Sequence, residues 1–197
     1  MKKNWEKAQD WEASWWGNCL NTYGEEEKQL LYARKMGLKF YHDKKSPYNI
    51  NIHNKTVIDV GGGPVSLLLK CHNLGPSWVV DPLSVPEWVK MRYEQAGIHL
   101  SQIPAEKIDV TGFDEAWIYN CLQHTDNPEK IVKNTLEAAK IIRVFEWVNT
   151  SKNDGHPHAF TAEILDEWFD GEGKRERLNG EANCFGDCWY GIFIGKG

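Results

Sequence analysis

The order of apolar and polar residues divides the chain into a start with a helical pattern and a longer part in which short apolar runs alternate with amphipathic segments. Short apolar runs bounded by turn-forming residues predict buried strands, and apolar residues three and four positions apart predict helices. Strands that alternate with helices indicate an α/β fold with a parallel sheet and helices on both faces. The pattern predicts strands at 57–60, 77–81, 98–103, 113–120, 141–148 and 188–195, with 174–184 as a candidate partner of the last, and helices from about 64 and over 85–97, 127–140 and 161–170.

The helical pattern at the start of the chain predicts a cap. Trp11 and Trp15 are four positions apart, and EEEKQLLYARKMGL reads as a second helix. Four of the ten tryptophans fall in the first sixteen residues, where they could form a core or docking surface, or a lid that excludes water from a site. Because no repeat or long linker divides the rest, we expect one domain over 1–197, with 1–48 as the helical cap or lid and 49–197 as the core.

Length, composition and charge narrow the class of protein. A chain of 197 residues with 41% hydrophobic and 26% charged residues can build one substantial core. No apolar run reaches the roughly 18 residues of a membrane helix, and MKKNWEKAQD lacks the apolar segment of a signal peptide, so we expect a cytoplasmic protein without a membrane partner. Five cysteines, an odd number, favour reduced thiols. The net charge of −5 makes nucleic acid an unlikely partner.

Three consecutive glycines interrupt the apolar pattern in TVIDVGGGPVSLLLK, residues 56–70. They stand between a predicted strand and a predicted helix, where glycine allows positive φ and close approach of a ligand, and where free helix amides favour an anionic group. Gly61, Gly63 and Ser66 match the dinucleotide fingerprint only in part. Asp59 would repel a pyrophosphate at close range and suits a ligand with a cationic amine, either by direct contact or by ordering the loop.

Three segments together resemble the class I S-adenosylmethionine-dependent methyltransferases, over roughly residues 50–197. VIDVGGGP is similar to the family's first motif, SWVVDPL to the end of its second strand, and FDEAWIYNCLQHTDNPEKIV to its fourth strand and the loop after it. The resemblance implies a Rossmann-like, doubly wound, mostly parallel seven-stranded sheet. It also implies S-adenosyl-L-methionine as the cofactor.

The resemblance assigns residues to that cofactor. The glycine loop and the acid before it match the segment that holds the methionine part, and Asp81 matches the acid that binds both ribose hydroxyls. Pro104 stands where the family often has an acid near the adenine, so Glu106 is the nearest substitute. The implied cofactor-binding residues are Asp59, Gly61, Gly62, Gly63, Asp81, Glu106 and Asn120.

The acceptor side is expected beyond the ends of the fourth and fifth strands. Methyl transfer from a sulfonium is an in-line displacement, which needs a base only where the acceptor keeps its proton. His124 and His158 are the candidate catalytic residues, because each follows one of these strands. His124 could instead be a structural hydrogen bonder, and the loop that holds His158 could be merely exposed. The residues expected to bind the acceptor are Trp15, Trp16, Glu146, Asn149 and His156.

No metal is expected in the site. Two histidines in the spacing HxH are a weak signal on their own, and Cys184 and Cys188 form CxxxC without the second pair of a zinc site.

These observations favour S-adenosylmethionine-dependent methyl transfer to a small-molecule acceptor, with a sugar or metabolite hydroxyl as the preferred class. One alternative is a nucleic acid or protein methyltransferase that uses a basic patch at Lys174, Arg175 and Arg177. However, YNCL after the fourth strand lacks the prolines that amino-methylating enzymes acting on adenine have there. A second alternative is a non-catalytic S-adenosylmethionine-binding module that docks through its tryptophans. A nicotinamide oxidoreductase is disfavoured by Ser66 and Asp59.

Overall fold

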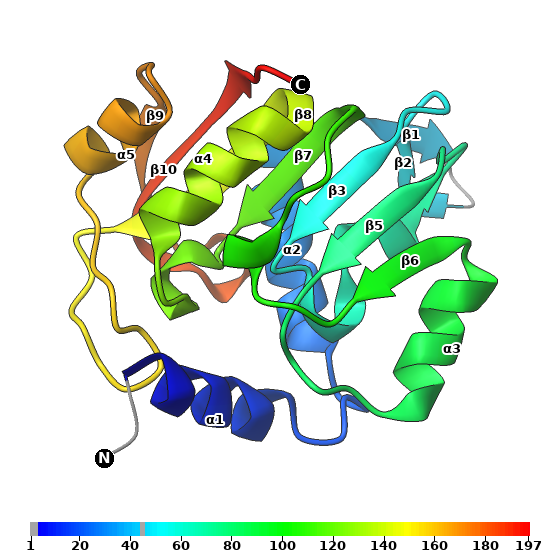
Figure 1. Ribbon diagram of the computed structural model, residues 1–197, viewed down its shortest axis with the longest axis horizontal. Helices are drawn as coiled ribbons and strands as arrows, with labels where there is room; N and C mark the ends of the chain where they lie inside the picture. Colours follow the sequence, from blue (N-terminus) through cyan, green and yellow to red (C-terminus); the bar gives the residue numbers. More distant parts are fainter. Residues whose placement is uncertain (1–3, 44–45) are drawn as a thin grey trace.

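The computed structural model describes residues 4–43 and 46–197, and its centre is a seven-stranded sheet in the order β6-β5-β3-β7-β8-β10-β9 (Figure 1). The five strands from β6 to β8 run parallel, and β10 is antiparallel to both of its neighbours. The predicted mostly parallel, Rossmann-like sheet is therefore confirmed. The strands are β3 (Val57–Val60), β5 (Ser77–Val80), β6 (Ile98–Ser101), β7 (Phe113–Tyr119), β8 (Ala139–Val148), β9 (Lys174–Asn179) and β10 (Phe185–Ile194).

Helices cover both faces of this sheet. In Figure 1, α4 (Pro128–Ala138) lies in front of the sheet and α2 (Tyr23–Lys35) lies behind it, while α3 (Glu87–Gln95) packs beside β6. α5 (Ala162–Trp168) is capped by Thr161, whose hydroxyl accepts a hydrogen bond from the Ile164 amide.

Neighbouring residues of one strand serve two separate cores because successive side chains point to opposite faces. On β7, Trp117 packs in the core that α2 covers, and Ile118 packs in the core that α4 covers. The same alternation places Val57 and Ile58 in different cores. None of the described helices combines the length and apolar character that a membrane crossing needs.

The predicted helical cap corresponds only to α1 (Asn4–Trp16). α1 lies beyond the carboxyl ends of the parallel strands, and Ala8 is its one buried residue among those that the structure describes (Figure 1). α2 contributes Leu31 and Tyr32 to a core, which Met36 joins directly after the helix, so α2 belongs to the body of the domain.

The expectation of helix up to residue 48 is wrong for the segment after α2. There β1 (Phe40–Asp43) and β2 (Ser46–Asn51) pair antiparallel, and β2 pairs parallel with β4 (Cys71–His72) in a small second sheet.

The prediction of an α-helix directly after the glycine loop is also wrong. Two 3₁₀ turns, η1 (Gly63–Val65) and η2 (Leu67–Lys70), take its place on either side of the extended Ser66. The Ser66 amide donates to the Tyr93 hydroxyl at 2.9 Å, and the Leu67 amide donates to the Tyr119 hydroxyl at 3.1 Å. Side chains from α3 and β7 thus bind two backbone amides of this segment, and among the described helices no long one points its amino terminus at the loop.

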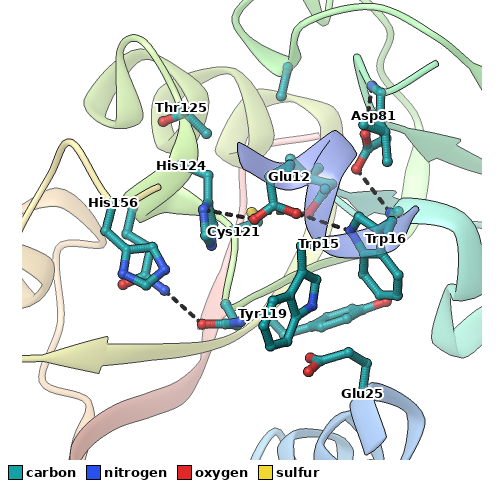
Figure 2. A pocket seen from close by; sticks show the side chains of 18 of the residues that line it. Glu12, Trp15, Trp16, Glu25, Asp81, Tyr119, Cys121, His124, Thr125 and His156 are labelled. Atoms are coloured by element: carbon teal, nitrogen blue, oxygen red, sulfur yellow. Dashed lines mark hydrogen bonds and ion pairs between the residues drawn. The ribbon is translucent and has the colours of Figure 1, made fainter. Parts of the chain in front are cut away.

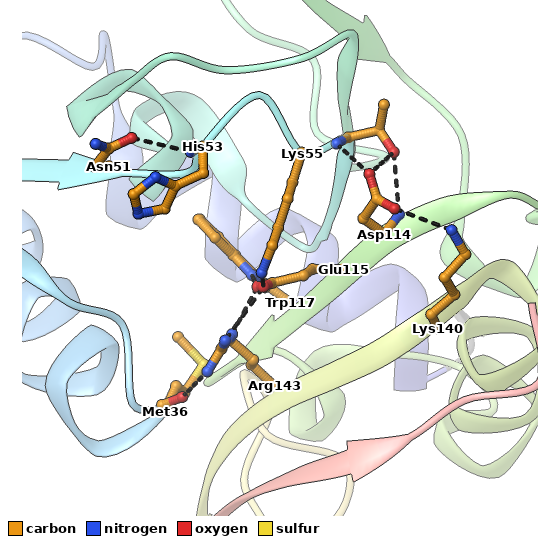
Figure 3. Close-up of polar contacts among 10 residues, drawn as sticks. Met36, Asn51, His53, Lys55, Asp114, Glu115, Trp117, Lys140 and Arg143 are labelled. Carbon is orange, nitrogen blue, oxygen red and sulfur yellow. Dashed lines mark hydrogen bonds and ion pairs between the residues drawn. The ribbon is translucent and has the colours of Figure 1, made fainter.

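A buried ionic cluster ties α2 to the sheet (Figure 3). Glu115 on β7 is only 2% exposed, and its carboxylate accepts hydrogen bonds from Arg143 Nε at 2.6 Å, Lys55 Nζ at 2.7 Å and Trp117 Nε1 at 3.0 Å. Arg143 also donates from Nη1 to the carbonyl of Met36, just after α2, at 2.9 Å. Burial alone would raise the pKa of Glu115, but the hydrogen bonds from Arg143 and Lys55 prevail and lower it to about 2.

Candidate functional site

A cavity of about 450 Å³ opens at the carboxyl ends of the parallel strands, beneath α1 (Figure 2). Its walls come from the turns after β3, β5 and β7, from α1 and α2, and from the end of β8. Its volume is typical of small-molecule sites, and its place is where open α/β sheets bind their ligands. Glu12, Trp15 and Trp16 point into it from α1 (Figure 2).

The three glycines of the loop are needed for three different reasons. Gly61 has φ +75°, and a Cβ there would lie 2.4 Å from the Cβ of Cys121. A Cβ on Gly62 would lie 2.7 Å from a carboxylate oxygen of Asp59. Gly63 has φ +59°, and its Cβ would meet only the Trp16 ring, at 3.5 Å. Gly63 is therefore the glycine that faces α1 across the cavity.

Asp59 lies behind the loop and does not line the cavity. It is fully buried, and its Oδ2 accepts hydrogen bonds from the Ser66 hydroxyl and, at 2.5 Å, from the Tyr119 hydroxyl. Burial raises its pKa to about 7, against the opposing effect of these two hydrogen bonds. Of the two roles expected for Asp59, this placement favours ordering of the loop.

Asp81 joins the turn after β3 to the turn after β5. Its Oδ2 accepts from the Gly63 amide at 2.9 Å, and its Oδ1 accepts from the Leu83 amide at 2.8 Å. Burial raises the pKa of Asp81 to about 6, and the two amides oppose that shift. The side chain lines the cavity and has further lone pairs for a ligand.

Glu106 and Asn120 line the same cavity. Glu106 Oε1 accepts from the amides of Asp126 and Asn127, both at 3.0 Å, so it holds the turn before α4. Asn120 has φ +53°, and its Oδ1 accepts from Gln123 Nε2 at 2.8 Å.

His124 ends the short turn η4 (Leu122–His124) and lines the cavity. Its Nδ1 lies 2.8 Å from the carbonyl oxygen of Gly155 and 3.0 Å from Glu12 Oε1. Because a carbonyl can only accept, Nδ1 carries the hydrogen and Nε2 keeps its lone pair. Burial lowers the pKa of His124 to about 4, so the ring is neutral at pH 7.

Glu12 is a site residue that the sequence analysis missed. It lines the cavity from α1, and its Oε2 accepts from Trp16 Nε1 at 3.0 Å. Burial raises its pKa to about 7, with a smaller opposing effect of the Trp16 hydrogen bond. The signal that could have found it is the spacing of Glu12 and Trp16, four positions apart on one helix face.

Aromatic rings surround these polar groups. Trp15 stacks on Trp11 at 5.3 Å between ring centroids, and His156 lies edge-on to His124 at 4.6 Å. Burial, and then the neighbouring His124, lowers the pKa of His156 to about 4. Trp15, Trp16 and His156, all expected at the acceptor side, line the cavity.

No model of a protein family matches the sequence, and no curated protein resembles it closely enough to match. Many solved structures are similar in fold, and three of them illustrate the likeness. The Burkholderia thailandensis 1,6-didemethyltoxoflavin-N1-methyltransferase, with bound 1,6-didemethyltoxoflavin and S-adenosylhomocysteine, has a TM-score of 0.65 at 14% identity, covering 100% of this chain and 92% of its own. The magnesium protoporphyrin IX methyltransferase of Synechocystis PCC 6803, with bound SAM, has a TM-score of 0.63 at 8% identity, covering 100% and 99%. The N-methyltransferase NodS of Bradyrhizobium japonicum WM9, with bound S-adenosylhomocysteine, has a TM-score of 0.57 at 12% identity, covering 88% and 87%.

The chain has the class I methyltransferase fold. At sequence identities of this size the similarity extends to the fold alone, because one fold can host many functions. The methyltransferase fold brings the glycine loop, Asp81, Glu106, Asn120 and His124 to one cavity, as the sequence analysis expects.

Besides Asp59, three expected site residues lie outside the residues that line this cavity. His158 Nε2 is 3.0 Å from the carbonyl oxygen of Thr125. Asn149 donates from Nδ2 to Asp187 Oδ2 at 3.3 Å. Glu146 is fully buried, and its Oε1 accepts from the amides of Cys121 and Leu122, both at 3.0 Å, which fixes the turn after β7.

The described residues contain no group of three or more His, Cys, Asp or Glu side chains suited to hold a metal ion. The basic patch considered for nucleic acid is largely neutralised. Arg175 pairs with Glu163 at 2.7 Å and Asp166 at 2.5 Å, and Arg177 pairs with Asp187 at 3.0 Å.

Proposed function

We propose that the protein transfers a methyl group from S-adenosyl-L-methionine to a small-molecule acceptor. The observation that carries this proposal is the bridge from Asp81 to the Gly63 amide, which holds a carboxylate at the cavity directly beside the glycine loop. In the proposed complex Asp81 accepts the ribose hydroxyls, and the Gly63 side of the loop receives the methionine part. Glu106 and Asn120 lie at the remaining turns of that wall, where we place the adenine.

The residues around the cavity suit a sulfonium cofactor. Carboxylates of Asp81 and Glu12 and the ring of Trp16 face the same space, and carboxylates and aromatic faces both attract a cation. The structures with S-adenosylmethionine or S-adenosylhomocysteine bound, at TM-scores of 0.57 to 0.65, add support for this choice of cofactor.

When bound, S-adenosylmethionine supplies an electrophilic methyl group on a positively charged sulfur. A metabolite hydroxyl, that of a sugar included, is the acceptor class that we propose. The acceptor oxygen forms the new bond to the methyl carbon as the bond from that carbon to sulfur breaks, and the hydroxyl proton leaves to a base. Rate enhancement then rests mainly on the alignment of acceptor, methyl and sulfur.

Glu12 is the residue that we propose as the base. A base works best with a pKa near the working pH, and burial raises the pKa of Glu12 to about 7, whereas burial lowers that of His124 to about 4. Trp16 Nε1 donates a hydrogen bond to Glu12 Oε2 and so orients the carboxylate, while His124 Nδ1 lies 3.0 Å from Glu12 Oε1. His158 has no part in this proposal, because it does not line the cavity.

Calorimetry with S-adenosylmethionine and S-adenosylhomocysteine tests the proposal. We expect the wild-type chain to bind both, and Asp81→Ala to bind about 10- to 100-fold more weakly, because the ribose hydroxyls lose a charged acceptor. Asp109→Ala, a change of an exposed aspartate outside the cavity, is the matched control. Binding of NAD in place of S-adenosylmethionine would overturn the proposal in favour of an oxidoreductase.

Incubation with a metabolite extract and an isotopically labelled methyl donor, followed by mass spectrometry, tests the transfer itself. A labelled small molecule supports the proposal. Cofactor binding without any labelled product would favour the non-catalytic module, and label in nucleic acid or protein would favour the other methyltransferase class.

A further inference from the structure

A second part of the cavity has no role in holding the cofactor as proposed. α2, the end of β8 and the turn η5 (Glu181–Asn183) line it, and α1 covers it. We call this part, lined by Trp15, Glu25, Gln29, Tyr32, Trp147 and Phe185, the α2 subsite.

Gln29 brings an unused hydrogen-bond acceptor to the α2 subsite. The residue is only 7% exposed and lines the cavity, and its Oε1 is buried without a hydrogen-bond partner in the part of the chain that the structure describes. A buried polar atom left unpaired costs about 1–3 kcal/mol, so native structures rarely keep one without a reason. A ligand with an N–H or O–H group would satisfy this atom.

Aromatic side chains from four different elements face the α2 subsite. Tyr32 on α2 and Trp147 on β8 meet edge-on at 6.3 Å, and both are largely covered by other residues. Trp15 on α1 and Phe185 on β10 are 54% and 72% exposed, which leaves large apolar surfaces uncovered at the mouth of the cavity. Rings on several sides bury and stack a flat molecule well.

The charge of the α2 subsite selects against an anion. Among the residues that line the cavity, Lys28 is the lysine that could attract an anion. The Nζ atom of Lys28 lies 2.6 Å from Glu25 Oε1, so the positive charge of Lys28 is already paired. The carboxylate of Glu12 lines the same cavity, and it repels a second negative charge.

We infer that the α2 subsite binds the methyl acceptor as a flat, ring-containing molecule, neutral or cationic, with an N–H or O–H group that donates to Gln29 Oε1. This inference rests on the proposed function and narrows its acceptor class. An extended apolar chain would leave Gln29 unpaired, and a phosphorylated or carboxylated acceptor would meet unfavourable charge.

Three naphthalene probes that differ in one group test the inference by binding alone. 2-Naphthol has an O–H donor, 2-methoxynaphthalene lacks it, and 2-naphthoate carries a negative charge. We expect ligand-detected NMR on the full chain, saturated with S-adenosylhomocysteine at pH 7, to rank 2-naphthol about 10-fold tighter than 2-methoxynaphthalene, as for one buried hydrogen bond, with 2-naphthoate the weakest.

Gln29→Leu should make the affinities of 2-naphthol and 2-methoxynaphthalene nearly equal, whereas Gln95→Leu, an exposed change on α3, should leave the preference intact. Equal affinities in the wild type, the same preference in Gln29→Leu, or tighter binding of 2-naphthoate would each overturn the inference. The order of the three probe affinities in the wild type tests the inference even if Gln29→Leu does not fold. Binding of S-adenosylhomocysteine is measured first, so its failure counts against the proposed function and leaves these outcomes separate.

Discussion

The Oε1 atom of Glu12 lies 3.0 Å from the Nδ1 atom of His124, so a carboxylate of α1 lies directly against the turn that follows β7. The contact has two consequences. It closes α1 over the cavity, and it presents a carboxylate with a pKa of about 7 to the space where the acceptor is proposed to bind. The burial that raises the pKa of Glu12 also keeps His124 neutral.

Glu12→Gln should lower turnover by about 10² to 10⁴, because glutamine keeps the shape of the side chain but takes no proton near neutral pH. In the wild type the rate should rise with pH and then level off, with the midpoint of the rise near pH 7, the pKa of Glu12. The variant should lose this rise. The measurement is turnover against pH with a labelled methyl donor, and Glu129→Gln on α4 is the control. If His124→Gln removes the midpoint and Glu12→Gln keeps it, His124 is the base.

Gly61→Ala should mainly lower the stability of the protein, whereas Gly63→Ala should mainly weaken ligand binding. At Gly61 the new Cβ would lie 2.4 Å from the Cβ of Cys121, so the variant should unfold at a clearly lower temperature. At Gly63 the new Cβ meets only Trp16, so we expect a loss of stability of about 1 kcal/mol from positive φ and a larger loss of S-adenosylhomocysteine affinity.

Thermal melts and calorimetry on both glycine variants distinguish the two effects. Cys121→Gly in the background of Gly61→Ala should restore part of the melting temperature, because it removes the Cβ that the new methyl group meets. An unchanged melting temperature in Gly61→Ala would contradict the packing described for the loop.

Glu115→Gln should destabilise the protein by about 3 kcal/mol, because it leaves the largely buried cation of Arg143 and the more exposed cation of Lys55 without a carboxylate. Glu163→Gln removes an exposed partner of Arg175 and should cost at most about 1 kcal/mol. Urea unfolding at pH 7 measures both variants, and similar losses in the two would argue against the buried cluster.

The Glu115 cluster also has a pH signature. The pKa of Glu115 is lowered from 4.5 to about 2 in the folded state, so the unfolded chain binds the proton first as the pH falls. The stability that the cluster contributes is complete above pH 4.5 and is lost progressively between pH 4.5 and 2. Glu115→Gln should show a weaker loss over this range than the wild type.

Two other buried carboxylates change the pH dependence of stability in the opposite direction to Glu115. Burial raises the pKa of Asp59 and of Glu146 to about 7, from 3.8 and 4.5. Between those values and pH 7 the folded state holds protons that the unfolded state has released, so stability falls as the pH rises toward 7 and then levels off. We expect the wild type to be less stable at pH 8 than at pH 5 by a few kcal/mol, roughly.

Glu146→Gln tests this direction, because its oxygen can still accept from the Cys121 and Leu122 amides but does not titrate. Urea unfolding at pH 5 and pH 8 should show a smaller difference in the variant. The same difference between pH 5 and pH 8 in Glu146→Gln and in the wild type would show that Glu146 is ionised in the folded protein over the whole range.

The strands of the sheet could be predicted because local patterns decide them. β3 is buried at every position, and so are the last five residues of β7, which a short apolar run between turn formers already indicates. The 3₁₀ turns after the glycine loop could not be predicted, because the hydroxyls of Tyr93 and Tyr119 that bind the backbone there come from distant parts of the chain.

The same limit explains the residues of the site. Asp81 and His124 could be predicted because they follow strands, whose ends must meet at one edge of a parallel sheet. Glu12 and Gln29 lie on helices α1 and α2. Which polar residues of a helix face a site can be known only once the packing of that helix is known. Glu146 is expected at the acceptor side because it lies near the end of the fifth predicted strand, before a polar loop, yet it is fully buried and accepts from the Cys121 and Leu122 amides.

The gathering of tryptophans around the cavity gives the protein a built-in optical sensor. Five of the ten indoles line it, namely Trp5, Trp11, Trp15, Trp16 and Trp147. A ligand that fills the cavity displaces water from these rings and changes their surroundings, whereas the other five report on the rest of the molecule. Emission from the unlabelled protein should therefore follow occupancy in real time, so that a library of colourless compounds can be sorted in a plate reader before any substrate is known.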